Sequence, residues 1–384
     1  MYSWGSNGYR QIDDGPSASY ATPKLVAAPT GKQWASVSAG YGHTLALCTD
    51  GTLYTWGTNH YGQLGNGIAS TLGRLQIPAP GSGQMWTQVA AGYNFSLALC
   101  SDGSLYAWGN NDQGQLGDGT TQQRLTPVRI TPPNGHRWTR ITAGFWNSAA
   151  LCSDGLLYMW GANHQGQLGD GTTTQQSASV PIPPPAGTSW QQVSTGYQHT
   201  IAVCSNGFLY VWGSNYYGEL GNGTNISRTT PSPVAPPTGL SWTQVACSSF
   251  HSLALASNGQ MYSTGYNFSG ELGNGTTTSS NRFVPIGSPL STSGFTETGS
   301  SQLSVSLHPN PFKELLQVEI TVQRACTASA TLYTALGQRV QHQLVSLRPG
   351  KNKTTISGLS ELTTGVYFLS ITAEHAQQIV QVVH

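Results

Sequence analysis

Residues 53–67, Leu-Tyr-Thr-Trp-Gly-Thr-Asn-His-Tyr-Gly-Gln-Leu-Gly-Asn-Gly, decide the fold of this 384-residue chain. The stretch returns with small changes at residues 105–119, 157–171, 209–223 and 261–275. Each copy begins 52 residues after the previous one, as from Leu53 to Leu105, without insertion or deletion. A fixed period near 50 residues is typical of repeat architectures, in which each unit buries its hydrophobic surface against a neighbour.

A second phrase keeps the same period and begins at Trp34 with Trp-Ala-Ser-Val-Ser-Ala-Gly-Tyr-Gly-His-Thr-Leu-Ala-Leu-Cys. Apolar residues come in short runs broken by Gly, Asn, Asp and Pro, which predicts strands rather than helices. Residues 44–48 and 53–56 flank the tight Asp50-Gly51 turn and predict a hairpin. Both strands are apolar on both faces, so we expect small sheets stacked around an axis, where neighbouring blades cover each other.

The Gly-Gln-Leu-Gly-Asn/Asp-Gly segment after Trp-Gly-x-Asn resembles the repeat of the RCC1 (regulator of chromosome condensation) family over about residues 1–286. The resemblance implies an all-β fold: an RCC1-like β-propeller with about five full repeats and one partial repeat. Thr264 departs from the pattern, because the other copies have Trp there, and Ser248 replaces a repeat Gly.

The N-terminal residues 1–33 hold only the later part of a repeat, so its first two strands are missing. Met1 falls at a position inside a predicted hairpin, and nothing before it resembles a signal peptide. We therefore expect an N-terminally shortened chain that has lost its export signal, and a ring that can be incomplete.

The period stops after residue 286, and residues 287–302 form a Ser/Thr/Gly-rich linker. Alternating apolar runs in residues 303–384 predict the strands of a small C-terminal β-sandwich of immunoglobulin type. This segment resembles the type A C-terminal sorting domain of the bacterial type IX secretion system. The residues that carry this resemblance include Pro309, Asn310, Pro311, Phe312, Gly337, Gly365 and Tyr367. It implies handling by the type IX secretion machinery and a place outside the cell or at the outer-membrane surface.

Charged residues make up 8% of the chain and the net charge is +1, whereas about 25% is ordinary for a soluble domain. Without a basic run the chain lacks the electrostatic footprint of a nucleic-acid binder. No stretch is long and apolar enough to span a membrane. Four of the six cysteines occupy one repeat position, where we expect them to be small buried hydrophobes.

The histidines His43, His199 and His251 share one repeat position, which Phe95 and Asn147 also occupy. A zinc site needs three or four ligands within bonding distance, so the exchange favours a structural role at a turn near the axis. Neither a metal nor another cofactor is expected.

Asp50 and Asp154 precede Gly in the predicted hairpin turns, where Asn206 replaces them in a later copy. Asp and Asn both suit turns, and a catalytic carboxylate would not tolerate the exchange. The chain is therefore not expected to be an enzyme. Guanine-nucleotide exchange, the best-known activity in the RCC1 family, needs a wedge-like insertion for which the unbroken period leaves no room.

Loop positions vary on this constant frame and are rich in aromatic residues, which give large contact area at low entropic cost. The expected binding residues are Tyr61, Trp146, Tyr216, Tyr217, Phe250 and Phe268. For Tyr41, Tyr93, Phe145 and Tyr197, packing between blades and ligand contact are equally expected. The favoured function is recognition of a surface protein or glycan. A propeller-based hydrolase or lyase, and a structural spacer, are the alternatives.

Overall fold

The computed structural model describes residues 1–13, 15, 17–70, 72–286, 304–308, 314–322, 324–334, 339–360, 362, 366–373 and 376–383. The chain divides into two compact units, Met1–Gly287 and Ser288–His384. Within the described ranges, a single 3₁₀ turn at Pro133–Gly135 interrupts an otherwise all-β structure, which confirms the predicted fold class.

The first unit contains five four-stranded antiparallel sheets, one for each full repeat, with strands paired in chain order. Their strands are β3 (Trp34–Ala39), β4 (His43–Cys48), β5 (Leu53–Gly57) and β6 (Leu72–Ile77); β7 (Trp86–Ala91), β8 (Phe95–Cys100), β9 (Leu105–Gly109) and β10 (Arg124–Ile130); β11 (Trp138–Ala143), β12 (Asn147–Cys152), β13 (Leu157–Gly161) and β14 (Gln176–Ile182); β15 (Trp190–Thr195), β16 (His199–Cys204), β17 (Leu209–Gly213) and β18 (Arg228–Val234); β19 (Trp242–Cys247), β20 (His251–Ala256), β21 (Met261–Gly265) and β22 (Ser280–Pro285). A two-stranded sheet of β1 (Tyr2–Ser6) and β2 (Ser19–Leu25) precedes them, so the first blade has only its two outer strands.

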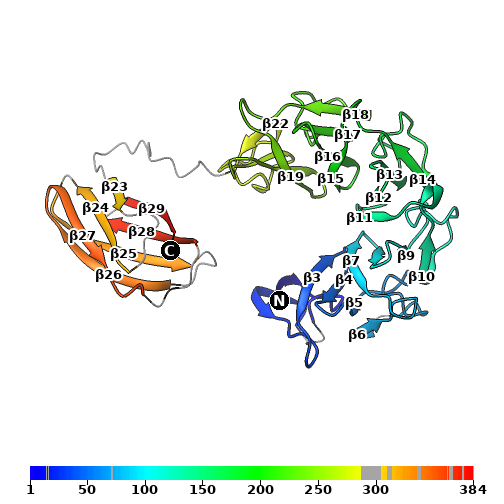
Figure 1. The fold of residues 1–384 in the computed structure, drawn as a ribbon, viewed down its shortest axis with the longest axis horizontal. Coiled ribbons are helices and arrows are strands. Elements are labelled where there is room, and N and C mark those ends of the chain that lie inside the picture. Colours follow the sequence, from blue (N-terminus) through cyan, green and yellow to red (C-terminus); the bar gives the residue numbers. More distant parts are fainter. Residues whose placement is uncertain are drawn as a thin grey trace. The chain divides into compact units, whose positions relative to one another are not determined.

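The sheets of this unit follow one another along an arc, with the first strand of each blade inside and the fourth outside (Figure 1). The inner strands contact their neighbours in the order β3, β7, β11, β15 and β19. Figure 1 shows the arc open between the β19–β22 sheet and the β1–β2 pair. The exposed side chains of Tyr2 and Trp4 lie on β1, whose inner edge has no strand partner among the described residues.

The second strand of each blade packs between neighbouring blades. Every residue of β4, β8, β12 and β16 is buried. One core cluster, for example, joins Leu97 of β8 and Leu105 of β9 to Tyr158 and Trp160 of the next blade. Both faces of these four sheets are thus covered, as the two-sided apolar pattern predicts, whereas β20 of the last blade is buried only at alternate residues.

The asparagine of Trp-Gly-x-Asn organises the loop that follows the third strand. In Asn111 the side-chain carbonyl accepts the Leu116 N–H at 3.0 Å, and the amide donates to the carbonyl oxygens of Thr120 at 3.1 Å and Gln122 at 3.0 Å. The same bonds form at Asn59, Asn163, Asn215 and Asn267. A buried amide with its donors and acceptor satisfied fixes one loop conformation in every repeat.

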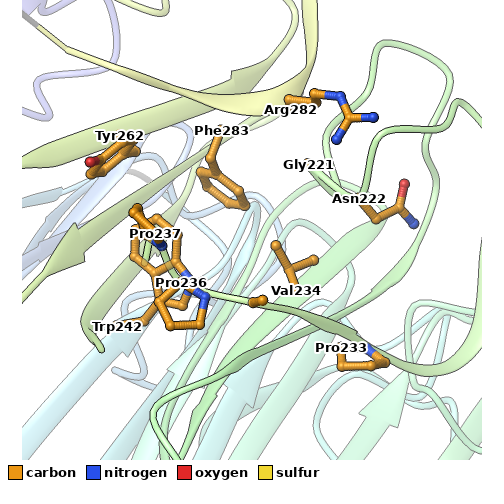
Figure 2. A pocket seen from close by; sticks show the side chains of 11 residues that line it. Gly221, Asn222, Pro233, Val234, Pro236, Pro237, Trp242, Tyr262, Arg282 and Phe283 are labelled. Carbon is orange, nitrogen blue, oxygen red and sulfur yellow. The ribbon is translucent and has the colours of Figure 1, made fainter. Parts of the chain in front are cut away.

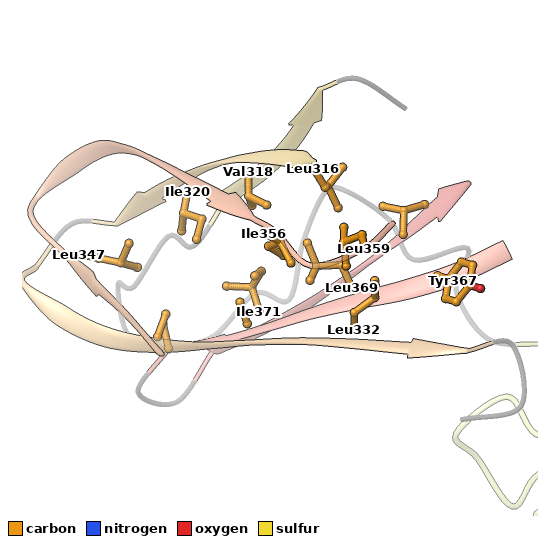
Figure 3. Packing of buried hydrophobic residues seen from close by; sticks show 14 of the residues in the cluster. Leu316, Val318, Ile320, Leu332, Leu347, Ile356, Leu359, Tyr367, Leu369 and Ile371 are labelled. Atoms are coloured by element: carbon orange, nitrogen blue, oxygen red, sulfur yellow. The ribbon is translucent and has the colours of Figure 1, made fainter. Parts of the chain in front are cut away.

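The second unit is a sandwich of two antiparallel sheets around one core (Figure 3). One sheet has the order β23 (Ser304–His308), β24 (Leu316–Val322), β27 (Gly350–Ile356), and the other β26 (Arg339–Leu347), β25 (Cys326–Thr334), β28 (Val366–Ala373), β29 (Ala376–Val383). The core contains Ile320, Leu332 and Leu369, and Tyr367 of the sorting motif is buried with them. The other sorting-motif positions, Pro309, Asn310, Pro311, Phe312, Gly337 and Gly365, lie outside the described residues.

Candidate binding site at the mouth of the central channel

Two loops of every blade meet at one end of the propeller. His43 at the start of the second strand pairs with Gly57 at the end of the third strand. The turn before His43 therefore lies beside the loop after Gly57. The turn is tight because the side chain that begins the second strand lies beneath it. A Cβ on Gly40 would be 2.3 Å from Cε1 of His43, so this position requires glycine. The residue after this glycine is therefore held at the channel mouth.

Aromatic rings at that position contact one another from blade to blade, through one stacked, one tilted and one edge-to-face pair. The ring centroids of Tyr41 and Tyr93 are 4.4 Å apart, those of Tyr93 and Phe145 3.8 Å, and those of Phe145 and Tyr197 4.4 Å. The backbone N–H groups of Tyr41 and Tyr93 donate to the carbonyl oxygens of Tyr93 and Phe145, at 3.2 Å and 3.3 Å. Blade-to-blade hydrogen bonds thus hold the rings at a fixed spacing.

The ring contacts continue into the last blade, although Ser249 takes the ring position there. Phe250, the next residue, places its ring 5.2 Å from that of Tyr197 and 5.8 Å from that of Tyr217. We call the connected set the aromatic row. It consists of Tyr9, Tyr41, Tyr93, Phe145, Trp146, Tyr197, Tyr217, Phe250, Tyr266 and Phe268.

The structure brings four of the six expected binding residues into the aromatic row. These are Trp146, Tyr217, Phe250 and Phe268. Phe268 is 63% exposed, whereas Trp146 is half-buried and its ring lies 4.6 Å from that of Phe145. The other two, Tyr61 and Tyr216, are exposed, and no ring contact joins them to the row within the described residues.

Two members of the row, Tyr9 and Tyr266, were absent from the sequence prediction. Tyr9 lies in the degenerate first copy, at the repeat position of Tyr61 and Tyr217. Tyr266 is the variable residue of Trp-Gly-x-Asn in the last copy. A comparison of aromatic residues by repeat position would have found Tyr9.

A cavity of about 240 Å³ opens along the channel below the row. The inner strands line it with small residues such as Ala39, Ala91 and Ala143, and the row contributes Tyr93 and Phe145. No charged side chain lines this cavity. The candidate site therefore presents aromatic rings to a partner, and its lining contains no charge that would attract a charged group.

The histidines near the channel are part of the framework. His43 and His199 are buried, and their Nε2 atoms lie 3.0 Å and 2.9 Å from the hydroxyls of Ser96 and Ser252 on the next blade. Burial lowers the pKa of His43 to about 4 and that of His199 to about 3, so both are neutral at physiological pH. Across the described part of the chain, no group of three His, Cys, Asp or Glu residues could hold a metal ion.

The hairpin carboxylates act as turn residues. The side chain of Asp50 accepts the Thr52 N–H at 3.0 Å, and Asn206 accepts the Phe208 N–H at 3.1 Å. Because a carboxylate and an amide oxygen make the same bond, Asp and Asn are interchangeable here.

Family models match both units. Residues 1–303 match the RCC1-like domain, and residues 306–384 match the secretion system C-terminal sorting domain. The ultraviolet-B receptor UVR8 of Arabidopsis thaliana is 32% identical over 294 residues, covering 77% of this chain and 67% of the receptor. The human E3 ubiquitin-protein ligase HERC2 is 32% identical over 261 residues, which cover 66% of this chain and 5% of the ligase.

Solved structures share the propeller fold at lower identity. Human WBSCR16 superimposes with a TM-score of 0.68 at 23% identity, over 75% of this chain and 76% of that protein. Prp20p of Saccharomyces cerevisiae superimposes with a TM-score of 0.65 at 24% identity, over 76% of this chain and 73% of that protein. Among the described residues, no helix has the length and apolar character needed to cross a membrane. The repeats and the two family matches together show that the chain belongs to the RCC1-like family of β-propellers, followed by a type IX C-terminal sorting domain that supports export to the cell surface or beyond.

Proposed function

We propose that this protein is a non-catalytic recognition module that binds an uncharged glycan or protein at the bacterial surface through the aromatic row. The continuity of the row across six blades carries the proposal. Ten rings lie in one connected set, and members such as Tyr41 and Phe268 keep more than half of their surface exposed. The sorting domain supports an extracellular place in which such a surface meets its partner.

Ring packing supports binding energetically. Tyr93 and Phe145 are half-buried and stacked, so their side chains are already ordered before a partner arrives. Ordered aromatic side chains lose little entropy on binding and supply large apolar areas. The uncharged cavity beneath them favours a neutral partner, because a charged one would lose hydration without a compensating contact.

The competing enzyme function has less support from the site. A hydrolase or lyase needs titratable groups that converge on a substrate. The lining of the channel cavity contains no Asp, Glu or His. His43 and His199 are buried and held by serine hydroxyls. A spacer function would give the exposed aromatic rings no role.

Paired tyrosines in one loop provide the test. Tyr217 belongs to the aromatic row, whereas its neighbour Tyr216 is 68% exposed and lies outside it. The full chain and its Tyr217→Ala, Tyr41→Ala and Tyr216→Ala variants would be compared on a glycan array and on intact cells of the source bacterium. We expect each substitution in the row to weaken binding about tenfold or more, as at a binding hot spot, and Tyr216→Ala to change it little. Equal binding by all forms would place the site elsewhere, and no binding at all would favour the spacer.

A further inference from the structure

A second cavity of about 400 Å³ lies between the outer strand β18 of the fifth blade and the β19–β22 sheet of the last blade. Figure 2 shows Trp242, Phe283 and Val234 around it, with the guanidinium of Arg282 and the amide of Asn222 beyond them. The residues that line it differ from those of the channel cavity. It lies where the last repeat departs from the others.

The departure is the absence of the repeat tryptophan. In the fourth blade, for example, Trp160 packs on Trp138 with a centroid distance of 5.9 Å. Thr264 stands at that position in the last blade. Its hydroxyl lies 2.8 Å from the carbonyl oxygen of Gly218, and Phe283 packs against Trp242 at 5.4 Å. The ring of Phe283 also lies against Gly221, where a Cβ would be 2.5 Å from it, as the indole of Trp160 lies against Gly117. Phenylalanine from the fourth strand thus takes the position of the indole from the third.

In the second blade, which keeps the repeat tryptophan Trp56, the arginine of the fourth strand packs on aromatic rings. Arg74 and Arg282 share one repeat position. The Arg74 guanidinium lies 5.4 Å and 5.2 Å from the ring centroids of Trp34 and Trp56, and its Nη1 donates to the carbonyl oxygen of Ala27 at 2.9 Å. Arginine and the two indoles together close the space between blades there.

Arg282 makes a different set of contacts in the last blade. Its guanidinium lies against Gly223, where a Cβ would be 2.9 Å from the guanidinium carbon. Among the described residues the guanidinium has no hydrogen-bond or ion-pair acceptor. A cation with five donors thus stands at the cavity without a partner.

A second donor at this cavity also lacks a partner. The blade-opening tryptophans Trp86, Trp138 and Trp190 donate their indole N–H to a backbone carbonyl at 2.8–3.1 Å. Trp242 is 3% exposed, and its Nε1 has no hydrogen-bond partner within the described part of the chain. A buried donor without an acceptor costs about 1–3 kcal/mol, so the contact between blades is less complete at this cavity than in the other copies.

We propose that this cavity is a binding site for an aromatic monocarboxylate, whose ring packs among Trp242, Tyr262 and Phe283 and whose carboxylate pairs with Arg282. Its walls are the rings of Trp242, Tyr262 and Phe283 and three prolines, and its lining holds no acidic side chain. Arginine pairs with carboxylates through two parallel hydrogen bonds. The volume is within the usual range for small-ligand pockets, about 300–1,000 Å³.

Titration calorimetry on the full chain tests this with phenylacetate, and with phenylacetamide as its uncharged match. We expect phenylacetate to bind at least about tenfold more tightly than the amide, since charge-assisted hydrogen bonds are the stronger ones. Arg282→Gln should remove this preference. The matched control is Arg74→Gln, which alters the same repeat position in the second blade and should leave binding unchanged.

A repeat-restoring variant tests the cavity itself. Thr264→Trp with Phe283→Pro gives the last blade the residues found in the fifth, where Trp212 and Pro231 stand. It should fold with at least wild-type stability and lose phenylacetate binding. Binding retained by this variant, Arg282→Gln with wild-type affinity, or no binding of phenylacetate by the wild type would each overturn the proposal. A peptide ending in Phe with a free carboxylate, compared with its C-terminal amide, distinguishes a polypeptide terminus from a free small acid.

Discussion

The indole Nε1 of Trp160 donates a hydrogen bond of 2.9 Å to the backbone carbonyl oxygen of Gln115, which lies in the preceding repeat. The hydroxyl of Ser148 donates to the same oxygen at 2.7 Å. Equivalent pairs join Trp108 to Gln63 and Trp212 to Gln167. The two most regular parts of the repeat, Trp-Gly-x-Asn and Gly-Gln-Leu-Gly, are thus the two sides of one contact between blades.

Trp160→Phe is expected to destabilise the propeller by about 2–3 kcal/mol, from one lost buried hydrogen bond and the cavity left by the smaller ring. Urea unfolding monitored by circular dichroism measures this. The control is Trp4→Phe at the same repeat position, where the side chain is 61% exposed. It should change the free energy of unfolding by less than about 0.5 kcal/mol. Equal effects at the two positions would show that the contact between blades does not matter.

Gly117, which lies against the indole of Trp160, offers an independent test of the packing between blades. Gly117 has φ +78°, and a Cβ there would be 2.7 Å from Nε1 of Trp160, whereas Gly119 has φ +81° and open space around it. Alanine is strained at both positions because of the positive φ, at a cost of about 1–2 kcal/mol. Gly117→Ala must also displace the indole, so we expect it to cost about 1–3 kcal/mol more than Gly119→Ala. The difference between the two variants in chemical unfolding isolates the steric term, and no difference would contradict the packing described here.

Glu219 is a buried carboxylate at a position where the three preceding full repeats have Gln. It accepts the Tyr217 N–H at 2.9 Å, and burial raises its pKa. A raised pKa means that the stability contributed by Glu219 is fully present below its unfolded pKa and is lost as the pH rises through the folded pKa. Glu219→Gln should therefore stabilise the protein by about 1 kcal/mol at pH 8 and have little effect at pH 4.

Thermal unfolding at both pH values checks this prediction. Glu271→Gln is the contrast at the next copy of the same position. Burial opposes ionisation there too, but hydrogen bonds that include the Ser269 N–H at 2.8 Å leave the pKa lowered. It should give no stabilisation at pH 8. A Glu219→Gln variant that is less stable than the wild type at pH 8 would contradict the argument.

The regular parts of the propeller follow from the sequence because each local signal agrees with the period. The Asp50-Gly51 turn and its flanking apolar runs predicted the hairpin that β4 and β5 form. Pro127 in β10 lies on an outermost strand, where no ladder donor is needed on the free edge. Agreement between turn chemistry, alternation and period leaves little freedom for another fold.

The two proposed binding surfaces follow from the sequence only in part. Phe250 joins the aromatic row because its ring reaches Tyr197 from a neighbouring position, across a serine that breaks the repeat. Such a contact depends on side-chain direction rather than on sequence spacing. Thr264 was visible as a departure, but the cavity in the same blade depends on how Phe283 and Arg282 pack. Repacking is a property of the surrounding shape, which a sequence pattern does not contain.

Buried neutral histidines give the propeller a predictable response to acid. Burial lowers the pKa of His43 to about 4, against 6.5 for an unburied imidazole. As the pH falls below 6.5 the unfolded chain takes up a proton that the folded chain refuses, so stability is lost between pH 6.5 and 4. His43 alone accounts for about 3 kcal/mol of this loss, and His199, with a pKa of about 3, adds to it in the same direction.

Replacing both histidines with phenylalanine tests the origin of this acid response. Phe95 occupies the equivalent position in the third blade and is 1% exposed, so the site accommodates the ring. Ser96 keeps its hydrogen bond to the carbonyl oxygen of Gln63 at 2.8 Å when the imidazole is gone. The doubly substituted chain, His43→Phe with His199→Phe, should therefore stay folded at pH 7.5 and lose at least about 3 kcal/mol less stability than the wild type on acidification to pH 4. Urea unfolding at both pH values measures the two losses. Equal losses in wild type and variant would show that other groups, such as paired carboxylates, determine the response to acid.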